Sequence, residues 1–410
     1  MRRSFQWIIA GLISRCIMLS NMGVFDMGAY YEWGKQTLQA GLISEYHGIY
    51  FPFQYQLFAL CAWFSAHMNL SWVVTFKAAN LLFDAGVFVL LCLLLERQHS
   101  NPAYALLYWL HPWFLAVFSL GYIDFQFTFF VLLAIYCARS DSIRDLALAG
   151  VPLGVAFLMK PQAQILIVAV VFYLVFHFVR SRDVRPAALL IGPSVLFLAY
   201  EAFFFIHGAA TALPISYLNV TNVMPALTAQ MPNIWYPIAY FLKQPGAAIY
   251  TVSDQLELLP HVTLKMMATA AVLLTLAIYI WRVERTDLPV SKKLIRIFGF
   301  AAILVPFVMT SAHENHLFLG TVFLVLLMAD NQPISFRIAA HGILAIQFLN
   351  ICGLYGQFPV GVTDLWTSHY SETLAMSYSV ISVCCFFFVI PRLFLKQKII
   401  GTIHSDFASM

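Results

Sequence analysis

Long apolar segments recur through the whole chain and are separated by short polar ones. Many are close to the roughly 20 residues that a helix needs to cross the hydrocarbon core of a bilayer. None shows the two-residue alternation of a transmembrane β-strand, so the backbone must satisfy its hydrogen bonds within helices. The charged fraction of 10% is also far below the roughly 25% of water-soluble domains. The predicted fold class is therefore all-α, a polytopic bundle of transmembrane helices.

The apolar segments divide the chain into about twelve predicted spans, of roughly 20 residues or fewer, within a single transmembrane domain, residues 1–410. Several are shorter than a perpendicular helix needs, which indicates kinked or partial spans. The predicted spans are residues 5–20, 73–95, 102–120, 123–137, 146–159, 165–179, 187–206, 262–281, 295–310, 317–328, 334–354 and 374–394.

The positions of the basic residues predict the orientation. If the N-terminus is cytoplasmic, 17 of the 23 lysines and arginines fall on the cytoplasmic side, as short loops require. Both termini are then cytoplasmic. We expect an integral protein of a bacterial inner (plasma) membrane with its site on the periplasmic side, or of the endoplasmic reticulum with its site in the lumen. The six exceptions are Arg15, Lys35, Lys77, Lys160, Lys243 and Lys265.

Two long segments are predicted to lie on the outer side. The first, residues 21–71, is expected to hold interfacial helices. Its semi-apolar stretch at 53–70 would invert the charge pattern of every later loop if it crossed the membrane. The second, residues 207–261, is rich in proline and aromatic residues, Trp235 among them. Together they predict a cap over the outer mouth of the bundle.

Several partners are disfavoured by the composition. The net charge of +4 is spread over short loops and forms no basic stripe, so no nucleic-acid partner is predicted. The seven cysteines fall almost all inside apolar segments without C-x-x-C spacing, which favours buried small side chains over disulfides or zinc. No cofactor is predicted.

Ionisable side chains near membrane depth are costly, which makes each one a candidate functional residue. Asp26 follows the first span, at the start of an expected amphipathic helix over residues 28–39 that contains Tyr30 and Trp33. The helix dipole would stabilise a carboxylate at that position. Two interpretations stay open: Asp26 caps the helix, or it serves as a catalytic base.

Two further outer turns carry polar or aromatic groups. In Tyr50-Phe-Pro-Phe-Gln-Tyr55 the rings can stack on a sugar face, or they can be the ordinary aromatic residues of a membrane interface. The short turn at residues 121–126 places Asp124 and Gln126 against the mouth of the bundle. Packing alone does not account for a lone carboxylate there.

The turn Met159-Lys-Pro-Gln162 puts Lys160 and Gln162 between two spans, where Pro161 ends a helix. Lys160 lies on the side opposite to the charge rule and indicates an anion, of which a phosphate is the natural one. The alternative is that its side chain reaches out to lipid headgroups.

The sequence His313-Glu-Asn-His316 gathers four polar residues where one span ends and the next begins. It lacks the i, i+4 histidine spacing of H-E-x-x-H, and no third ligand is obvious, so a zinc site is disfavoured. Two imidazoles and the Glu314 carboxylate could instead hydrogen-bond a phosphate leaving group.

Taken in order, these motifs resemble the GT-C superfamily of polyprenyl-phosphate-sugar-dependent membrane glycosyltransferases, in its mannosyl- and glucosyltransferase branch. The resemblance extends over about the first 330 residues and ends at the His-Glu-x-His motif. It implies a polyprenyl-phosphate hexose as donor, a glycan or glycolipid as acceptor, membrane lipid as surroundings, and an acidic residue of the first outer loop that acts on the acceptor. The chain departs from the family in having a single Asp rather than an acidic pair in that loop, and no D-x-D motif.

The resemblance assigns roles to individual residues. Asp26 would be the base, and transfer would invert the anomeric carbon. The donor phosphate would be held by Lys160, His313 and His316, with Arg15 as a further candidate. The remaining candidate substrate-binding residues are Asp124, Gln126, Gln162, Glu314, Tyr30, Trp33, Tyr55 and Trp235. No metal is assigned.

A secondary transporter or lipid flippase is the main alternative, and a structural membrane protein is the third. Transporters place substrate charges near the midplane on broken helices, often within repeated halves. In this chain the polar residues collect at one side and no convincing internal repeat is present. The enzyme is therefore favoured.

Overall fold

The structure is a computed structural model that describes residues 2–24, 26–46, 49–210, 212–219, 224–330, 332–355 and 371–395. It is almost entirely helical. The helices of the first half are α1 (Arg2–Met18), α2 (Asp26–Ala40), α3 (Leu42–Glu45), α4 (Pro52–His67), α5 (Trp72–Arg97), η1 (Pro102–Tyr104), α6 (Ala105–Leu110), α7 (Pro112–Leu120), α8 (Asp124–Cys137), α9 (Ile143–Phe157), η2 (Pro161–Ala163) and α10 (Gln164–Ser181). The helices of the second half are η3 (Arg185–Leu190), α11 (Ile191–Ile206), α12 (Ala212–Asn219), α13 (Trp235–Leu242), η5 (Ile249–Thr251), α14 (Leu264–Glu284), α15 (Val290–Val308), α16 (Phe318–Ala329), α17 (Ile334–Tyr355) and α18 (Glu372–Leu395).

Among the described residues the only sheet is a two-stranded antiparallel hairpin of β1 (Glu257–Leu259) and β2 (Val262–Thr263). The all-α prediction is thus confirmed. The described chain contains six helices that are long and apolar enough to cross a membrane, or seven if the bent pair of α6 and α7 forms one span. The count of twelve spans and the GT-C fold stay predictions.

The helices that fall short of a full span include α8, with 14 residues, and α16, with 12. The length rule applies to a helix that faces lipid, because its ends must reach polar surroundings. Helix α16 is instead enclosed by protein, since every residue from Phe318 to Met328 is buried. Its length is therefore set by its helical neighbours.

The break between α6 and α7 bends the chain by 50°. Pro112 stands at the start of α7, and His111 before it has the extended backbone that a following proline favours. The His111 side chain accepts a hydrogen bond from the Trp113 backbone N–H and so satisfies one free donor at the new helix start.

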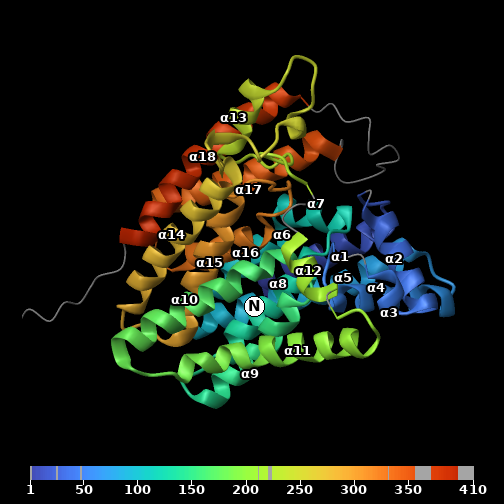
Figure 1. The fold of residues 1–410 in the computed structure, drawn as a ribbon, viewed down its shortest axis with the longest axis horizontal. Coiled ribbons are helices and arrows are strands. Elements are labelled where there is room, and N and C mark those ends of the chain that lie inside the picture. The colour runs from blue at the N-terminus through green and yellow to red at the C-terminus, as the bar shows by residue number, and fades with distance from the viewer. Residues whose placement is uncertain are drawn as a thin grey trace, which may run out of the picture.

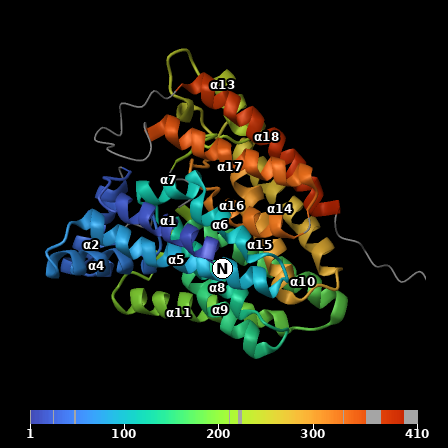
Figure 2. The ribbon, with the colours of Figure 1, turned by 180° about the vertical axis from the view of Figure 1, so that it is seen from behind.

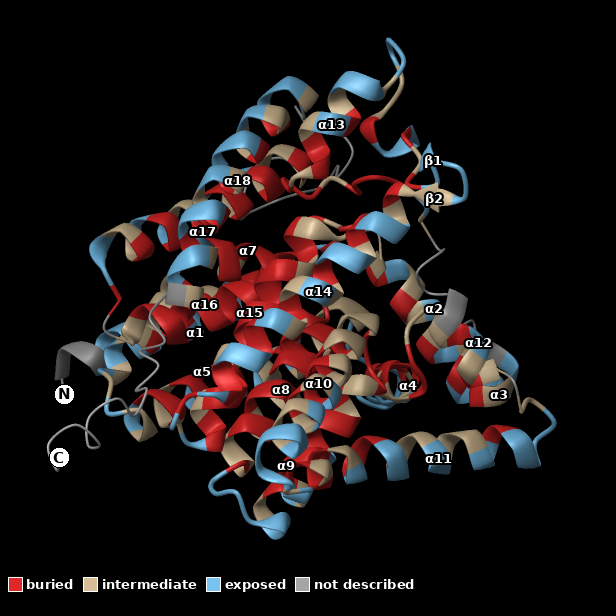
Figure 3. Ribbon diagram, turned by 60° about the vertical axis from the view of Figure 1, so that its left-hand side comes forward, coloured by how far each residue is buried: buried red, intermediate tan, exposed pale blue. Residues whose placement is uncertain are grey.

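The helices divide into two groups around a buried centre. Figure 1 shows α1–α5 at one side, α13, α14, α17 and α18 at the other, and α8, α15 and α16 between them; Figure 2 shows the same arrangement from behind. Buried residues concentrate in the central helices, whereas outer helices such as α11 carry many exposed ones (Figure 3). The exposed side chains include Leu198, Leu274 and Phe387. Such large apolar groups on the periphery suit lipid contact.

Three glycines allow α9 and α11 to pack closely. A Cβ added to Gly192 would lie 2.2 Å from the Gly150 carbonyl group, and one on Gly154 would lie 2.8 Å from the Gly192 backbone. The two helices therefore pack backbone against backbone, as small residues permit in membrane proteins. Phe157 at the end of α9 also lies near Phe197 of α11, with ring centroids 6.3 Å apart.

The first of the two long segments predicted to lie on the outer side forms α2, α3 and α4. The helix expected over residues 28–39 is present as α2, and the semi-apolar stretch at 53–70 forms most of α4. Tyr30 of α2 stacks on Phe58 of α4, with ring centroids 4.7 Å apart. Gly34 is needed at the same crossing, since a Cβ there would lie 2.5 Å from the Phe58 carbonyl oxygen. These contacts fix the angle at which α2 presents its first residue, Asp26.

Candidate functional site

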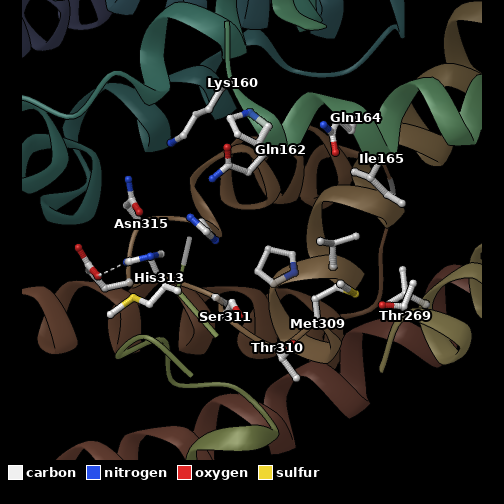
Figure 4. A pocket seen from close by; sticks show the side chains of 18 of the residues that line it. Lys160, Gln162, Gln164, Ile165, Thr269, Met309, Thr310, Ser311, His313 and Asn315 are labelled. Atoms are coloured by element: carbon white, nitrogen blue, oxygen red, sulfur yellow. Dashed lines mark ion pairs between the residues drawn. The ribbon is translucent and has the colours of Figure 1, made fainter. Parts of the chain in front are cut away.

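A cavity of about 390 Å³ opens where several helix ends meet. We call it the site cavity. Lys160 and Gln162 enter it from the segment between α9 and α10, and His313 and Asn315 enter from the segment between α15 and α16 (Figure 4). The polar lining residues are Asp26, Tyr50, Tyr122, Lys160, Gln162, Gln164, Lys265, Thr269, Thr310, Ser311, His313, Glu314, Asn315 and His316. Apolar residues of α10, α14 and α15 extend the cavity away from these groups.

Asp26 begins α2 and lines the cavity with a half-buried carboxylate. The Tyr30 hydroxyl lies 3.4 Å from this carboxylate and 3.2 Å from the hydroxyl of Tyr50. Burial raises the pKa of the Asp26 carboxyl, and the negative charge of Glu314 adds to the rise. The result is a carboxylate of increased basicity that faces the cavity.

Lys160 is almost fully buried, and its ammonium lies 2.6 Å from the Asp124 carboxylate. The second oxygen of Asp124 accepts a hydrogen bond of 2.9 Å from the Asn315 side chain. The sequence predicted a bound phosphate as the anion beside Lys160. In the structure this anion is the Asp124 carboxylate of the same chain. The interaction joins the start of α8, the turn before α10 and the turn before α16.

Glu314 is buried and accepts hydrogen bonds from the hydroxyls of Tyr122 and Tyr355 through the same oxygen, Oε1. Its other oxygen lies 3.9 Å from Nδ1 of His313. This arrangement keeps the Glu314 carboxylate in place and turns one oxygen toward the imidazole.

His316 has its ring centroid 5.0 Å from that of His313. Burial lowers the pKa of His316 well below its usual range, and the positive charges of His313 and Lys160 lower it further. At neutral pH the His316 imidazole is therefore uncharged. It can donate a hydrogen bond to an anion but does not neutralise one.

The structure brings together six of the thirteen residues that the sequence assigned to the site. Six line the site cavity, namely Asp26, Lys160, Gln162, His313, Glu314 and His316. Asp124 lies directly behind them and contacts Lys160. The others that the sequence assigned lie outside the lining.

Tyr30 and Trp33 of α2 and Tyr55 of α4 belong to an aromatic cluster between these helices, in which Trp33 stacks on Tyr55 with ring centroids 5.7 Å apart. Gln126 is buried and hydrogen-bonds Gln54 and Asn80 at 2.8 and 2.7 Å. These side chains support the cavity wall.

Arg15 and Trp235 lie away from the cavity. The Arg15 guanidinium is fully buried, pairs with Asp84 and donates to the Trp109 carbonyl oxygen at 2.8 Å. A buried cation needs such a partner, so Arg15 is held in the packing of α1, α5 and α6. The indole N–H of Trp235 donates to the Val308 carbonyl oxygen at 2.6 Å and ties α13 to the end of α15.

Several lining residues were not singled out by the sequence. Lys265 was noted only as one of six basic residues that do not fit the predicted cytoplasmic side. This departure from the charge rule is the one sequence signal that pointed to its place in the cavity. Tyr122 stands two residues before Asp124, in a turn the sequence did mark. Ser311, which lines the cavity, and Tyr355, which is not part of the lining but contacts Glu314, carry no pattern of their own, because their roles arise from contacts with distant segments.

No group of three or more His, Cys, Asp and Glu side chains that could hold a metal ion occurs among the residues the structure describes. The fold and the cavity define an α-helical protein of membrane character with a cavity that is lined by charged, polar and apolar side chains. Comparison of the sequence with models of known protein families and with curated proteins found no match. The chemistry of the site cavity therefore carries the functional argument.

Proposed function

We propose that this protein is a GT-C-type glycosyltransferase that moves a hexose, mannose or glucose, from a polyprenyl-phosphate carrier to a lipid-linked or surface glycan. One observation carries the proposal: a carboxylate of raised pKa, Asp26, shares a cavity with a set of cationic and hydrogen-bonding groups on other segments. Glycosyl transfer from a lipid phosphate requires these two parts, a base for the acceptor and a site for the departing anion.

In the proposed reaction, Asp26 takes the proton of an acceptor hydroxyl. The hydroxyl oxygen forms a bond to the anomeric carbon while the bond from that carbon to the phosphate oxygen breaks. The polyprenyl phosphate leaves with the electron pair, and a single displacement inverts the anomeric configuration. The proton ends on Asp26 and is released to solvent.

The departing phosphate is assigned to His313, His316 and Lys160, which all line the cavity. His316, uncharged at neutral pH, donates a hydrogen bond, whereas Lys160 supplies positive charge that is shared with Asp124. Apolar side chains of α10 and α14, such as Val168 and Val272, line the same cavity. The cavity therefore has a polar end and an apolar side, which suits a donor that has a polar sugar phosphate and an apolar polyprenyl chain.

A transporter is less well supported by the site. A transporter's charged groups face a pathway near the middle of the membrane. Here the deeply buried charges of Arg15 and Asp84 neutralise each other, and the candidate site lies at helix ends.

The test is to replace Asp26 by Asn in cells that otherwise lack the protein. Asn keeps the shape of the side chain and its ability to cap a helix but cannot accept the proton. We expect product formation to fall by about a hundredfold to ten-thousandfold, the usual contribution of a general base, while the lipid donor still binds. Mass spectrometry of lipids and glycans should show a species one hexose short.

The matched control is Glu32→Gln, an exposed carboxylate of the same helix, for which we expect transfer close to that of the wild type. Asp26→Asn that transfers hexose within a few-fold of the wild type would contradict the assignment of the base and turn attention to Asp124 or Glu314. Identical lipid and glycan profiles with and without the protein would contradict the proposed function itself.

A further inference from the structure

A buried carboxylate outside the site cavity holds the cavity's walls together. Asp254, in the outer segment between η5 and β1, is fully buried. Its Oδ2 accepts a hydrogen bond from the Thr310 hydroxyl at 2.9 Å, and its Oδ1 accepts one from the Gln255 side chain at 2.7 Å. Its Oδ2 also lies 3.2 Å from the Ser311 hydroxyl, whose single proton is shared between this oxygen and the Ala226 carbonyl oxygen at 3.2 Å. The side-chain donors to this carboxylate that the described residues supply are all uncharged. A buried carboxylate without a cationic partner depends on such hydrogen bonds to offset the loss of water.

The backbone of Asp254 contacts two other segments. Its N–H donates to the Pro225 carbonyl oxygen at 3.2 Å, and its carbonyl oxygen accepts from the Lys265 N–H at 3.0 Å. One residue thus joins the second outer segment, the start of α14 and the turn after α15. Lys265, Thr310 and Ser311 all line the site cavity.

The turn that Asp254 holds is strained. Ser311 has a φ of 59°, a left-handed conformation that residues other than glycine rarely adopt. Its N–H donates to the Ala226 carbonyl oxygen at 2.9 Å, and the Ala229 N–H donates to the Ala312 carbonyl oxygen at 2.9 Å. These contacts and the Asp254 carboxylate maintain the strained turn two residues before His313, where a small displacement would move the imidazole.

We propose that Asp254 is a positioning residue, which sets the places of His313 and Lys265 in the cavity by holding the three segments together. The carboxylate acts on the turn through Thr310 and Ser311, and the backbone acts on the start of α14. Its effect on hexose transfer rests on the proposed function. Its effect on the turn does not, and can be measured without a substrate.

Hydrogen–deuterium exchange of the purified protein in lipid nanodiscs tests the effect on the turn. In Asp254→Ala we expect exchange to rise roughly tenfold or more in peptides that contain the Ser311 and Ala229 amides, because hydrogen bonds to a charged acceptor are lost. Exchange in α8 should not change. Asp254→Asn keeps an oxygen for the two hydroxyls, and a turned Gln255 amide can accept from its NH₂ group, so protection should return.

Glu257→Ala, which removes an exposed carboxylate three residues away, is the matched control and should leave both peptides protected. If Asp254→Ala does not fold, Thr310→Val removes one donor and should raise exchange in the same peptides by a smaller factor. Unchanged exchange in the Ser311 and Ala229 peptides, or an equal rise throughout the protein, would overturn the positioning role.

A measurement of hexose transfer provides a second test of the positioning role. If Asp254 acts through His313, Asp254→Ala should lower donor use in the wild type but cause no further loss, beyond about twofold, in a His313→Ala background. Full additivity of the two losses would overturn the inference. If the wild type transfers no hexose at all, the proposed function fails, and the exchange result still decides whether Asp254 positions the turn.

Discussion

Asp26 shows how one residue's surroundings determine its use. Its pKa is raised first by burial and then by the charge of Glu314, whereas His313, Tyr30 and Lys160 act in the opposite direction. A base works only when ionised, so activity must be lost as the pH falls through this raised pKa. We therefore expect the acid limb of kcat/KM to lie above the value of about 3.9 of an ordinary aspartate.

Glu314→Gln removes the negative charge that raises the pKa of Asp26, so the acid limb should move to lower pH in the residual activity. The profile of kcat/KM against pH measures this shift. Glu32→Gln, which removes an exposed charge, should leave the limb in place. A limb that does not move in Glu314→Gln would show that another group controls it.

Lys160 leads to a prediction about stability as well as activity. Removing it leaves the buried Asp124 with Asn315 as its one remaining side-chain partner among the described residues. Breaking a buried ion pair in this way costs about 3 to 5 kcal/mol, so Lys160→Met should lower the thermal stability markedly. This differs from the expectation for a lysine that only binds a phosphate, whose loss would leave the fold intact.

The double variant Lys160→Met, Asp124→Asn removes both charges and should recover most of that stability without restoring transfer. Lys35→Met, at an exposed lysine, is the control and should change neither property. Thermal unfolding in nanodiscs measures all three variants. A Lys160→Met protein as stable as the wild type would mean that the pair with Asp124 contributes little.

At the scale of elements, the crossing of α9 and α11 depends on glycine. The atoms that a Cβ on Gly192 would meet are backbone atoms of Gly150 and Val151, at 2.2 to 2.5 Å, which cannot rotate away. Gly192→Ala should therefore push the helices apart and destabilise the protein by about 1 to 3 kcal/mol, measured by thermal unfolding. The control is Gly28→Ala, where a Cβ meets nothing within 4 Å and stability should hold or rise slightly.

A second element-scale feature ties α10, α14 and α15 at the ends remote from the site cavity. The buried Glu284 carboxylate lies 2.8 Å from Nδ1 of His177 and 3.0 Å from the Lys293 ammonium. The opposite ends of the same three helices line the cavity. A fixed contact at one end limits how far the helices can separate at the other.

At the scale of the whole molecule, the orientation can be tested across α14. This helix of 21 residues is about 31 Å long, close to the thickness of a bilayer core. Glu257 and Asp287 are exposed and lie beyond its two ends. In a variant whose own cysteines are replaced by alanine, Glu257→Cys should react with an impermeant reagent in intact cells. Asp287→Cys should react only after permeabilisation, and the reverse pattern would contradict the predicted sidedness.

The helical class and many of the site residues could be predicted from the sequence. Apolar segments of span length indicate helices whatever their neighbours are, because lipid offers the backbone no hydrogen bonds. Polar residues between such segments, such as Lys160 and His313, lie near helix ends. Because the predicted topology puts these ends on the same side of the membrane, the sequence predicted that the two residues share one face of the bundle. Arg15, the further candidate for the donor phosphate, is instead buried and paired with Asp84, a contact between distant segments that the sequence pattern does not reveal.

The sequence by itself determined that this chain is helical and apolar enough for a membrane, and that its charged turns are candidate sites. Only the tertiary structure decided which groups pair: Lys160 with Asp124, 36 residues away, Arg15 with Asp84, 69 away, and Glu314 with Tyr122, 192 away. The physical reason is that a buried charge needs a partner to offset the cost of losing water, but the sequence does not show which residue this partner is. The partner is selected by how the helices pack, and that selection leaves Asp26 and His313 facing the cavity.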